Sequence, residues 1–293
     1  MRQPTRQPAA RLVQPGGRHR RAVPASLPEG SPALILAVPN RSDESLHGPV
    51  REIATILSLD NPALDVVPAR IAPGDSTGIR AALEQAAARR PGTLAAVVLP
   101  MITGPHPAIV HALNEAITVS GVNACVAEVF NTNALLAEAL HIRLADAGLA
   151  RADRVRMFSI TTSADGIIVA TVGGQEAIAM GSVTAVLLAA RLALPVLPAS
   201  LDSRPTIQEQ AAQIQAMGVS RIALAPCVIG PEVDMAAIEE AASAIGAKCA
   251  APLGAHGNVV KLISQAYGMA LSNVEPAQFE SPAGPADLAH AAG

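Results

Sequence analysis

Aromatic residues are almost absent from this sequence of 293 residues. Phe, Tyr and Trp together make up 1% of it and Trp does not occur, whereas apolar residues as a whole make up 50%. The core must therefore be built from aliphatic side chains. Without aromatic rings the chain also lacks the platforms on which the bases of single-stranded nucleic acids stack.

An excess of basic charge is missing as well. The chain carries 21 Lys and Arg residues against 24 Asp and Glu residues, which gives a formal net charge of −3. No broad basic field is available to neutralise phosphates, so we expect no nucleic-acid partner. The apolar runs are short and interrupted by Pro, Gly or charged residues, and none reaches the about 18 residues of a membrane span. We therefore expect no membrane partner.

Cysteine is scarce and scattered. Cys125, Cys227 and Cys249 lie in apolar runs and form no Cys-x-x-Cys pair, which argues against a structural zinc site. Buried free thiols are typical of a reducing compartment, and we expect a cytoplasmic protein. Residues 1–31 are rich in Arg and Pro and lack the apolar centre of a secretory signal, so we expect a disordered arm there. Residues 275–293 are expected to form a flexible tail.

What the chain does contain is the same half twice. Leu94 to Pro105 reads LAAVVLPMITGP, and Ser220 to Pro231 reads SRIALAPCVIGP, so that Gly104 and Gly230 occupy the same place in the two copies. A repeat of this length is a whole α/β domain rather than a solenoid unit. We expect two such domains, at residues 32–150 and 151–274, with a cleft for a small molecule between them.

Strand and helix patterns alternate through both halves. This alternation predicts two four-stranded parallel sheets with helices on both faces and right-handed crossovers. Ligands of such folds bind outside the carboxyl ends of the strands. The predicted strands are 33–38, 64–69, 94–99, 124–129, 166–171, 196–200, 221–225 and 248–251. The predicted helices are 49–59, 77–89, 107–120, 133–147, 182–193, 206–217, 235–245 and 258–271.

With this order of elements, the chain resembles the sirohydrochlorin chelatases, which are type II tetrapyrrole chelatases, over about residues 32–271. The resemblance rests on the turns LPMITGP and APCVIGP, on the polar run Arg41 to Glu44, and on APLGAHGNVVKLISQAY, Ala251 to Tyr267. It implies a lyase of siroheme or cobalamin synthesis that inserts Co²⁺, Fe²⁺ or Ni²⁺, as a substrate, into a carboxylate-rich tetrapyrrole. No organic cofactor is implied.

The sequence departs from the family where the family binds its metal. The family uses two histidines, one after the first strand and one after the third, but Pro39 and Ala108 stand at these places. The loop histidine His106 is the candidate metal ligand and catalytic group, with His111 as a second ligand. Glu232 is the repeat-equivalent of His106 and could face it across the cleft. The alternative for His106 is a solvated loop side chain.

Candidate substrate-binding groups lie at the strand ends. Arg41 suits a tetrapyrrole carboxylate because a guanidinium binds a carboxylate bidentately, although it could equally pair with Asp43. Asn40 and the glycines offer backbone donors for anions. His256 is a further candidate for substrate binding; its alternative role is only to hold the conformation of its turn. The full set that we expect to bind substrate is Asn40, Arg41, Ser42, Gly104, Gly173, Gly174, Glu232 and His256.

Two functions remain open from the sequence. One is an active chelatase, which we expect to be a monomer because the repeat supplies both walls of the cleft. The other is a non-catalytic tetrapyrrole- or metal-binding protein that has lost the catalytic histidines. A periplasmic-type binding protein shares the two-lobed layout, but the missing secretory signal argues against it.

Overall fold

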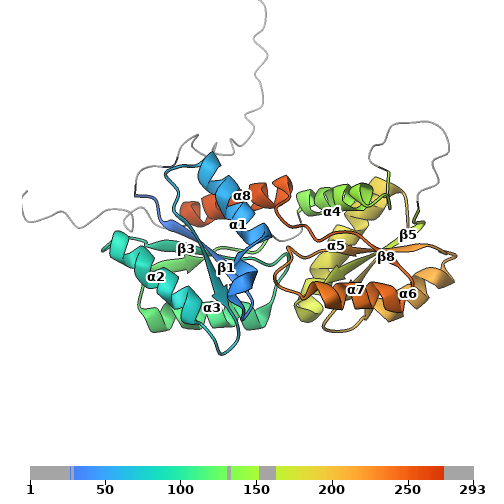
Figure 1. Ribbon diagram of the computed structural model, residues 1–293, viewed down its shortest axis with the longest axis horizontal. Coiled ribbons are helices and arrows are strands. Elements are labelled where there is room, and N and C mark those ends of the chain that lie inside the picture. The colour runs from blue at the N-terminus through green and yellow to red at the C-terminus, as the bar shows by residue number, and fades with distance from the viewer. Residues whose placement is uncertain (1–26, 28–29, 131–132, 152–162, 274–293) are drawn as a thin grey trace, which may run out of the picture.

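The computed structural model describes residues 27, 30–130, 133–151 and 163–273, so the expected arm and tail lie almost wholly outside the described residues. Two four-stranded sheets lie side by side, with strand orders β2-β1-β3-β4 and β6-β5-β7-β8 (Figure 1). Every pair of neighbouring strands is parallel, as the alternating pattern predicts. The strands are β1 (Ala33–Pro39), β2 (Val66–Ile71), β3 (Ala96–Pro100), β4 (Ala124–Val126), β5 (Gly166–Thr171), β6 (Val196–Ser200), β7 (Ile222–Pro226) and β8 (Lys248–Cys249).

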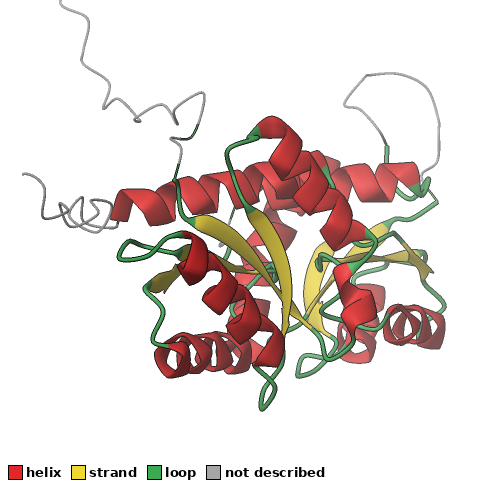
Figure 2. Cartoon of the chain, turned by 60° about the vertical axis from the view of Figure 1, so that its left-hand side comes forward, coloured by secondary structure: helices red, strands yellow, loops and turns green. Residues whose placement is uncertain are grey.

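Helices cover both faces of each sheet (Figure 2). The central strands β1 and β5 are therefore buried on both sides, which explains their continuous apolar sequences. The core is aliphatic, with Phe130 and Tyr267 as its described aromatic members. The helices are η1 (Asp43–Leu46, a 3-10 turn), α1 (Pro49–Asp60), α2 (Thr77–Arg89), α3 (Pro107–Ser120), α4 (Ala134–Asp146), α5 (Gly174–Leu192), α6 (Ile207–Ala216), α7 (Met235–Ala244) and α8 (Gly257–Asn273).

The two halves exchange helices. Helix α8 ends the second half in sequence, yet it packs on β3 and α1 of the first half, and α4 of the first half packs on α5 and β7 of the second. One core cluster consequently runs through both halves and joins Leu36 of β1, Ile263 of α8 and Val169 of β5. Two smaller clusters lie on the other face of each sheet, one under α2 and α3 and one under α6 and α7.

Helix α5 begins eight residues earlier than the sequence suggests, at Gly174 rather than residue 182. The sequence predicts a turn at Gly173-Gly174, and both glycines do have positive φ, of 118° and 78°. The helix nevertheless starts within this pair, at Gly174. The helix is thus 19 residues long. By length and composition α5 could cross a membrane, and a third of that stretch is buried inside the protein.

Candidate functional site

The loops at the carboxyl ends of the strands meet between the two halves. Asn40, at the end of β1, donates its side-chain amide to the carbonyl of Pro231 at 2.9 Å. Thr103, after β3, donates its hydroxyl to the carbonyl of Cys227 at 2.5 Å. These bonds join the first half to the second across the crevice in which we expected the ligand.

Gly173 allows a close approach between the halves. A Cβ atom at this position would lie 2.4 Å from the carbonyl oxygen of Pro105, and the φ of 118° disfavours any side chain. A cavity between the halves, lined by Thr103, Gly104 and Met180 among others, has a volume of about 10 Å³. That is about the least space that one water molecule needs, so a macrocycle would fit at this place only if these loops separated.

His106 lies in this crevice, directly before α3. Its Nδ1 atom is buried and has no hydrogen-bond partner among the described residues. The nearby acid is Asp202, in the loop after β6. Burial would raise the pKa of the Asp202 carboxyl, but hydrogen bonds from Ser200 and two backbone amides, together with the charge of His106, hold that pKa below its ordinary value.

The two amides that bond Asp202 belong to Gly173 and Gly174, at 2.9 and 3.3 Å. The Ser200 hydroxyl donates to the same carboxylate at 2.7 Å. These glycine amides were expected to bind an anion, and the anion that they meet is a carboxylate of the chain itself. The sequence analysis missed Asp202, because the residue is recognised only by the amides of another loop that bond to it.

Glu232 lies in the loop after β7 and turns toward its own loop. Its carboxylate accepts hydrogen bonds from the amides of Ile229 at 2.5 Å and Gly230 at 2.7 Å. Burial raises the pKa of this carboxyl to about 7 in spite of these bonds. The carboxyl whose pKa the charge of His106 helps to lower is that of Asp202. A shared role for His106 and its repeat-equivalent Glu232 stays a prediction.

The turn after β1 is held by local bonds. The amide of Ser42 donates to the side-chain oxygen of Asn40 at 2.9 Å, and the Ser42 hydroxyl caps η1 by accepting from the amide of Glu44 at 3.2 Å. Arg41 is exposed and donates to the carbonyl of Pro73 at 2.7 Å. Asp43, the alternative partner of Arg41, bonds Arg70 instead.

The other two candidate histidines are His111 and His256. His111 is exposed on α3, five residues after His106. His256 accepts the amide of Asn258 at 3.1 Å and so holds the turn before α8; burial and the charge of Arg143 lower its pKa. No group of three or more His, Cys, Asp or Glu residues that could hold a metal occurs in the part of the chain that the structure describes.

The three cysteines are free thiols. Cys227 is buried in the crevice, and this burial raises the pKa of its thiol to about 12. Cys125 and Cys249 are half-buried, and burial raises the pKa of each thiol as well. Burial therefore favours the protonated form of all three thiols.

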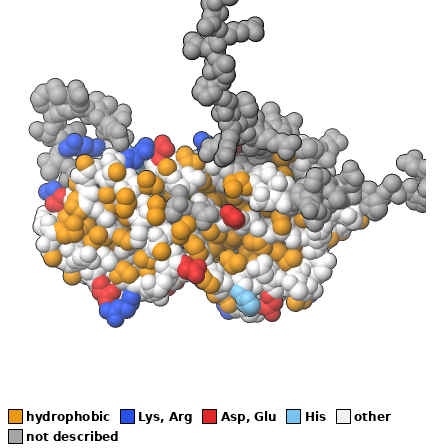
Figure 3. Space-filling model, turned by 180° about the vertical axis from the view of Figure 1, so that it is seen from behind, with side chains coloured by type: hydrophobic (Ala, Val, Ile, Leu, Met, Phe, Trp, Pro, Cys, Tyr) orange, Lys and Arg blue, Asp and Glu red, His pale blue; other side chains and the backbone are white. Residues whose placement is uncertain are grey.

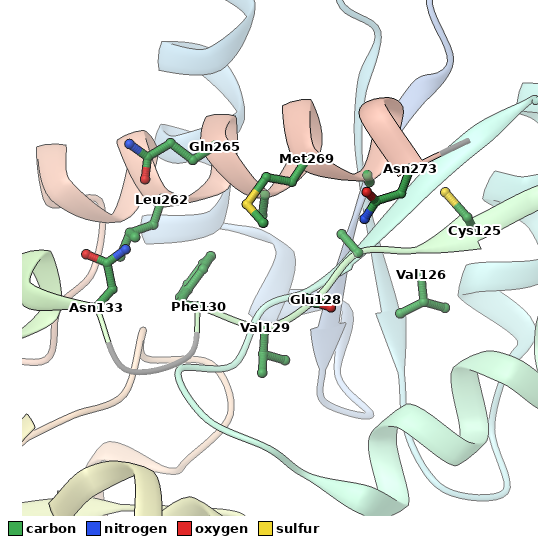
Figure 4. A pocket seen from close by; sticks show the side chains of 13 residues that line it. Cys125, Val126, Glu128, Val129, Phe130, Asn133, Leu262, Gln265, Met269 and Asn273 are labelled. Carbon is green, nitrogen blue, oxygen red and sulfur yellow. The ribbon is translucent and has the colours of Figure 1, made fainter. Parts of the chain in front are cut away.

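A larger hollow lies outside the crevice, between the end of β4 and α8 (Figure 4). Its volume of about 440 Å³ falls in the range of small-molecule sites. Val129, Phe130 and Met269 form its apolar lining, with Asn133 and Gln265 among the polar groups. The sequence could not reveal this hollow, because it exists only through the exchange that puts α8 over the first sheet.

The fold matches solved structures of sirohydrochlorin chelatases. SirB, a sirohydrochlorin chelatase from Bacillus subtilis subspecies spizizenii solved with cobalt, is 12% identical, with a TM-score of 0.57 over 82% of this chain and 95% of that one. SirB from Bacillus subtilis with Fe³⁺ is 13% identical, with a TM-score of 0.61 over 80% and 92%. CbiX, described as the terminal enzyme of siroheme biosynthesis in denitrifying bacteria, is 15% identical, with a TM-score of 0.58 over 83% and 100%.

By sequence the chain stands apart, since no family model and no curated protein matches it. Structural similarity at identities this low establishes the fold alone. The coverage is nevertheless nearly complete for all three neighbours, so the likeness includes both halves and their arrangement. The chain has the α/β fold of the sirohydrochlorin chelatases, with two four-stranded parallel sheets.

Proposed function

We propose that this protein is a sirohydrochlorin chelatase-like enzyme that inserts a divalent metal, Co²⁺, Fe²⁺ or Ni²⁺, into a carboxylate-rich tetrapyrrole in the crevice between its halves. The fold supports the class of protein, since chelatases of this fold were solved with cobalt and with Fe³⁺. The proposal extends that class to the chemistry of this chain, with His106 in place of the usual histidines.

The observation that carries the proposal is the free Nδ1 atom of His106. A buried nitrogen without a hydrogen-bond partner costs about 1–3 kcal/mol of folding free energy, and a ligand that bound this nitrogen would remove that cost. Imidazole is a good ligand for cobalt, nickel and iron, and it takes up protons near neutral pH. His106 is therefore suited both to hold the incoming metal and to accept a proton.

The reaction releases two protons from the pyrrole nitrogens as the metal binds to the ring. His106 accepts one of these protons, and the carboxylate of Asp202 stabilises the imidazolium that results. The second proton passes to solvent when the product leaves. Arg41 is exposed and bonded only to a carbonyl in the described contacts, so its guanidinium is free to turn toward a carboxylate of the macrocycle.

A non-catalytic tetrapyrrole- or metal-binding protein is the second candidate. It is favoured by the lack of a three-ligand metal cluster among the described residues, and by the use of the Gly173 and Gly174 amides for Asp202. In this case the crevice would hold a macrocycle without exchanging its protons for a metal.

An anaerobic absorbance assay with sirohydrochlorin and Co²⁺, Ni²⁺ or Fe²⁺ separates the two. Wild type is compared with His106→Ala and Asp202→Asn. His47→Ala is the matched control, because His47 is exposed and has no part in the proposed reaction. Insertion above the spontaneous rate that is lost in His106→Ala and kept in His47→Ala supports the chelatase. Tight macrocycle binding without insertion supports the binding protein. If the protein neither binds the macrocycle nor inserts a metal, both candidate functions are overturned.

A further inference from the structure

Helix α5 is apolar on its outward face as well as on its buried one. Its inner residues pack toward β5 and β6 and α4. On the outer side, Val186 is 67% exposed and Val183 is 42% exposed, and Ala179 and Ala190 are exposed with them. The outer stripe is defined as Ala179, Val183, Val186, Leu187 and Ala190.

The spacing of the outer stripe is that of a helix–helix contact. Ala179, Val183, Val186 and Ala190 follow one another by four, three and four positions, as the seam residues of packed helices do. No charged residue occurs from Ala177 to Ala190. A helix that is apolar all round belongs inside a larger assembly or a membrane. The side opposite to the view of Figure 1 likewise shows broad apolar areas with few charged side chains among them (Figure 3).

The repeat led us to expect a monomer, but we propose instead that the outer stripe of α5 is the contact between two copies of this chain, with the two α5 helices antiparallel about a twofold axis. The axis passes between Val183 and Val186, so that Val183 of one copy packs against Val186 of the other. Ala179 then meets Ala190, and the small side chains let the helix ends approach. A twofold contact needs only one patch that is complementary to itself, which the symmetric order Ala-Val-Val-Ala provides.

The charges at the two ends of the stripe fix the direction. Glu176 lies in the first turn of α5 and Arg191 in the last. An antiparallel pair puts Glu176 of one copy beside Arg191 of the other at both ends, whereas a parallel pair would put like charges together. Arg191 is held in place by Glu138 at 3.5 Å and by Nδ1 of His141 at 3.0 Å, so its guanidinium is already fixed near the end of the helix.

A second copy fits this face better than a lipid bilayer does. Helices that lie on membranes carry Lys and Arg along their polar side, and α5 has a single basic residue at one end and an acidic one at the other. The opposite side of α5 is committed to the core, with Ala185 and Leu188 buried in the cluster that joins both halves. A helix that left the fold to span a membrane would lose these core contacts.

The test is the mass of the full-length protein in solution, measured by light scattering after size exclusion over a range of concentrations. Wild type is expected to have the mass of two chains, and Val186→Glu that of one. Val119→Glu is the matched control, because Val119 is 61% exposed on α3, outside the stripe, and this variant should remain a dimer. Circular dichroism establishes that each variant is folded.

A mixing experiment tests the antiparallel register. Val183→Lys and Val186→Glu should each be monomeric alone, while their mixture should regain the mass of two chains through one Lys–Glu pair. A wild-type monomer at every concentration, or a dimer that Val186→Glu leaves intact, would overturn the proposal. So would co-sedimentation of a monomeric wild type with phosphatidylcholine–phosphatidylglycerol vesicles that Val186→Glu abolishes, which would assign the stripe to a membrane.

Discussion

Tyr267 of α8 donates its hydroxyl to the carbonyl of Pro32 at 2.7 Å, although 235 positions separate the two residues. Pro32 directly precedes β1, the central strand of the first sheet, and Tyr267 is 3% exposed. This bond fastens the helix of one half to the sheet of the other. Burial raises the pKa of the Tyr267 hydroxyl well above its usual range, which favours the protonated hydroxyl that this bond needs.

Replacing Tyr267 with Phe should lower the free energy of unfolding by about 1–3 kcal/mol, because the buried carbonyl of Pro32 loses its partner. Urea unfolding measures this difference. Ser272→Ala is the control, since the Ser272 hydroxyl bonds only the carbonyl of Gly268 within the same exposed turn, and it should change stability far less. Equal effects of the two substitutions would mean that the bond to Pro32 does not hold the halves together.

Gly173→Ala should destabilise the protein by more than about 1 kcal/mol, because the new Cβ meets the carbonyl of Pro105 in addition to the strain of positive φ. Gly174→Ala suffers strain of the same kind but has open space around its Cβ. The difference between the two variants in thermal unfolding isolates the contact between the halves. If Gly174→Ala proved as costly, the closed crevice would not be the conformation in solution.

Glu232 should make the protein less stable as the pH rises. Its pKa is raised from 4.5 to about 7 in the folded state, so between these values the folded protein binds more protons than the unfolded chain. Stability from this group is therefore full below pH 4.5 and is lost as the pH approaches 7, by at most about 3 kcal/mol.

Unfolding free energies from pH 5 to pH 8 test this for Glu232. Relative to Glu232→Gln, the wild type should lose stability over the lower part of this range and stay level above pH 7. Glu240→Gln, on the exposed side of α7, serves as the control and should keep the wild-type slope. A wild-type slope that Glu232→Gln also shows would place the titration on another group.

Thr103→Val should strengthen tetrapyrrole binding if the proposed function is correct. The substitution removes the hydroxyl that bonds the carbonyl of Cys227 across the crevice, and so makes the separation of the loops less costly by about 1 kcal/mol. A gain of about fivefold in affinity for sirohydrochlorin is expected from absorbance titration. Thr118→Val is the control, because Thr118 bonds only Asn114 within α3. Weaker binding by Thr103→Val would mean that the hydroxyl contacts the ligand instead.

Local patterns in the sequence predict most of the elements. The helix at 77–89 and the strands at 166–171 and 196–200 have the predicted bounds, because buried periodicity and the residues that end each element lie within the element itself. Strand β4 is shorter than predicted and ends at Val126, where the chain leaves the first sheet toward α4. Its apolar sequence continues to Phe130, which packs in the shared core rather than in the sheet.

The relations between elements are what the sequence does not contain. The exchange of α4 and α8 follows from contacts between residues more than a hundred positions apart, such as Arg143 with the carbonyl of Leu253. The role of Asp202 depends on amides that another loop presents. His106 could be named as a candidate because it follows a strand, but its unpartnered nitrogen becomes visible only when the second half closes over it.

The exchange of helices also sets an order of events during synthesis. When the first sheet has left the ribosome, the face that α8 will cover is still bare, since α8 spans Gly257–Asn273 and is made last among the described elements. Leu34, Leu36 and Val38 on that face cannot be enclosed until then. The first half therefore cannot complete its core while the chain is growing, and this apolar face stays uncovered until nearly all of the described chain has been translated.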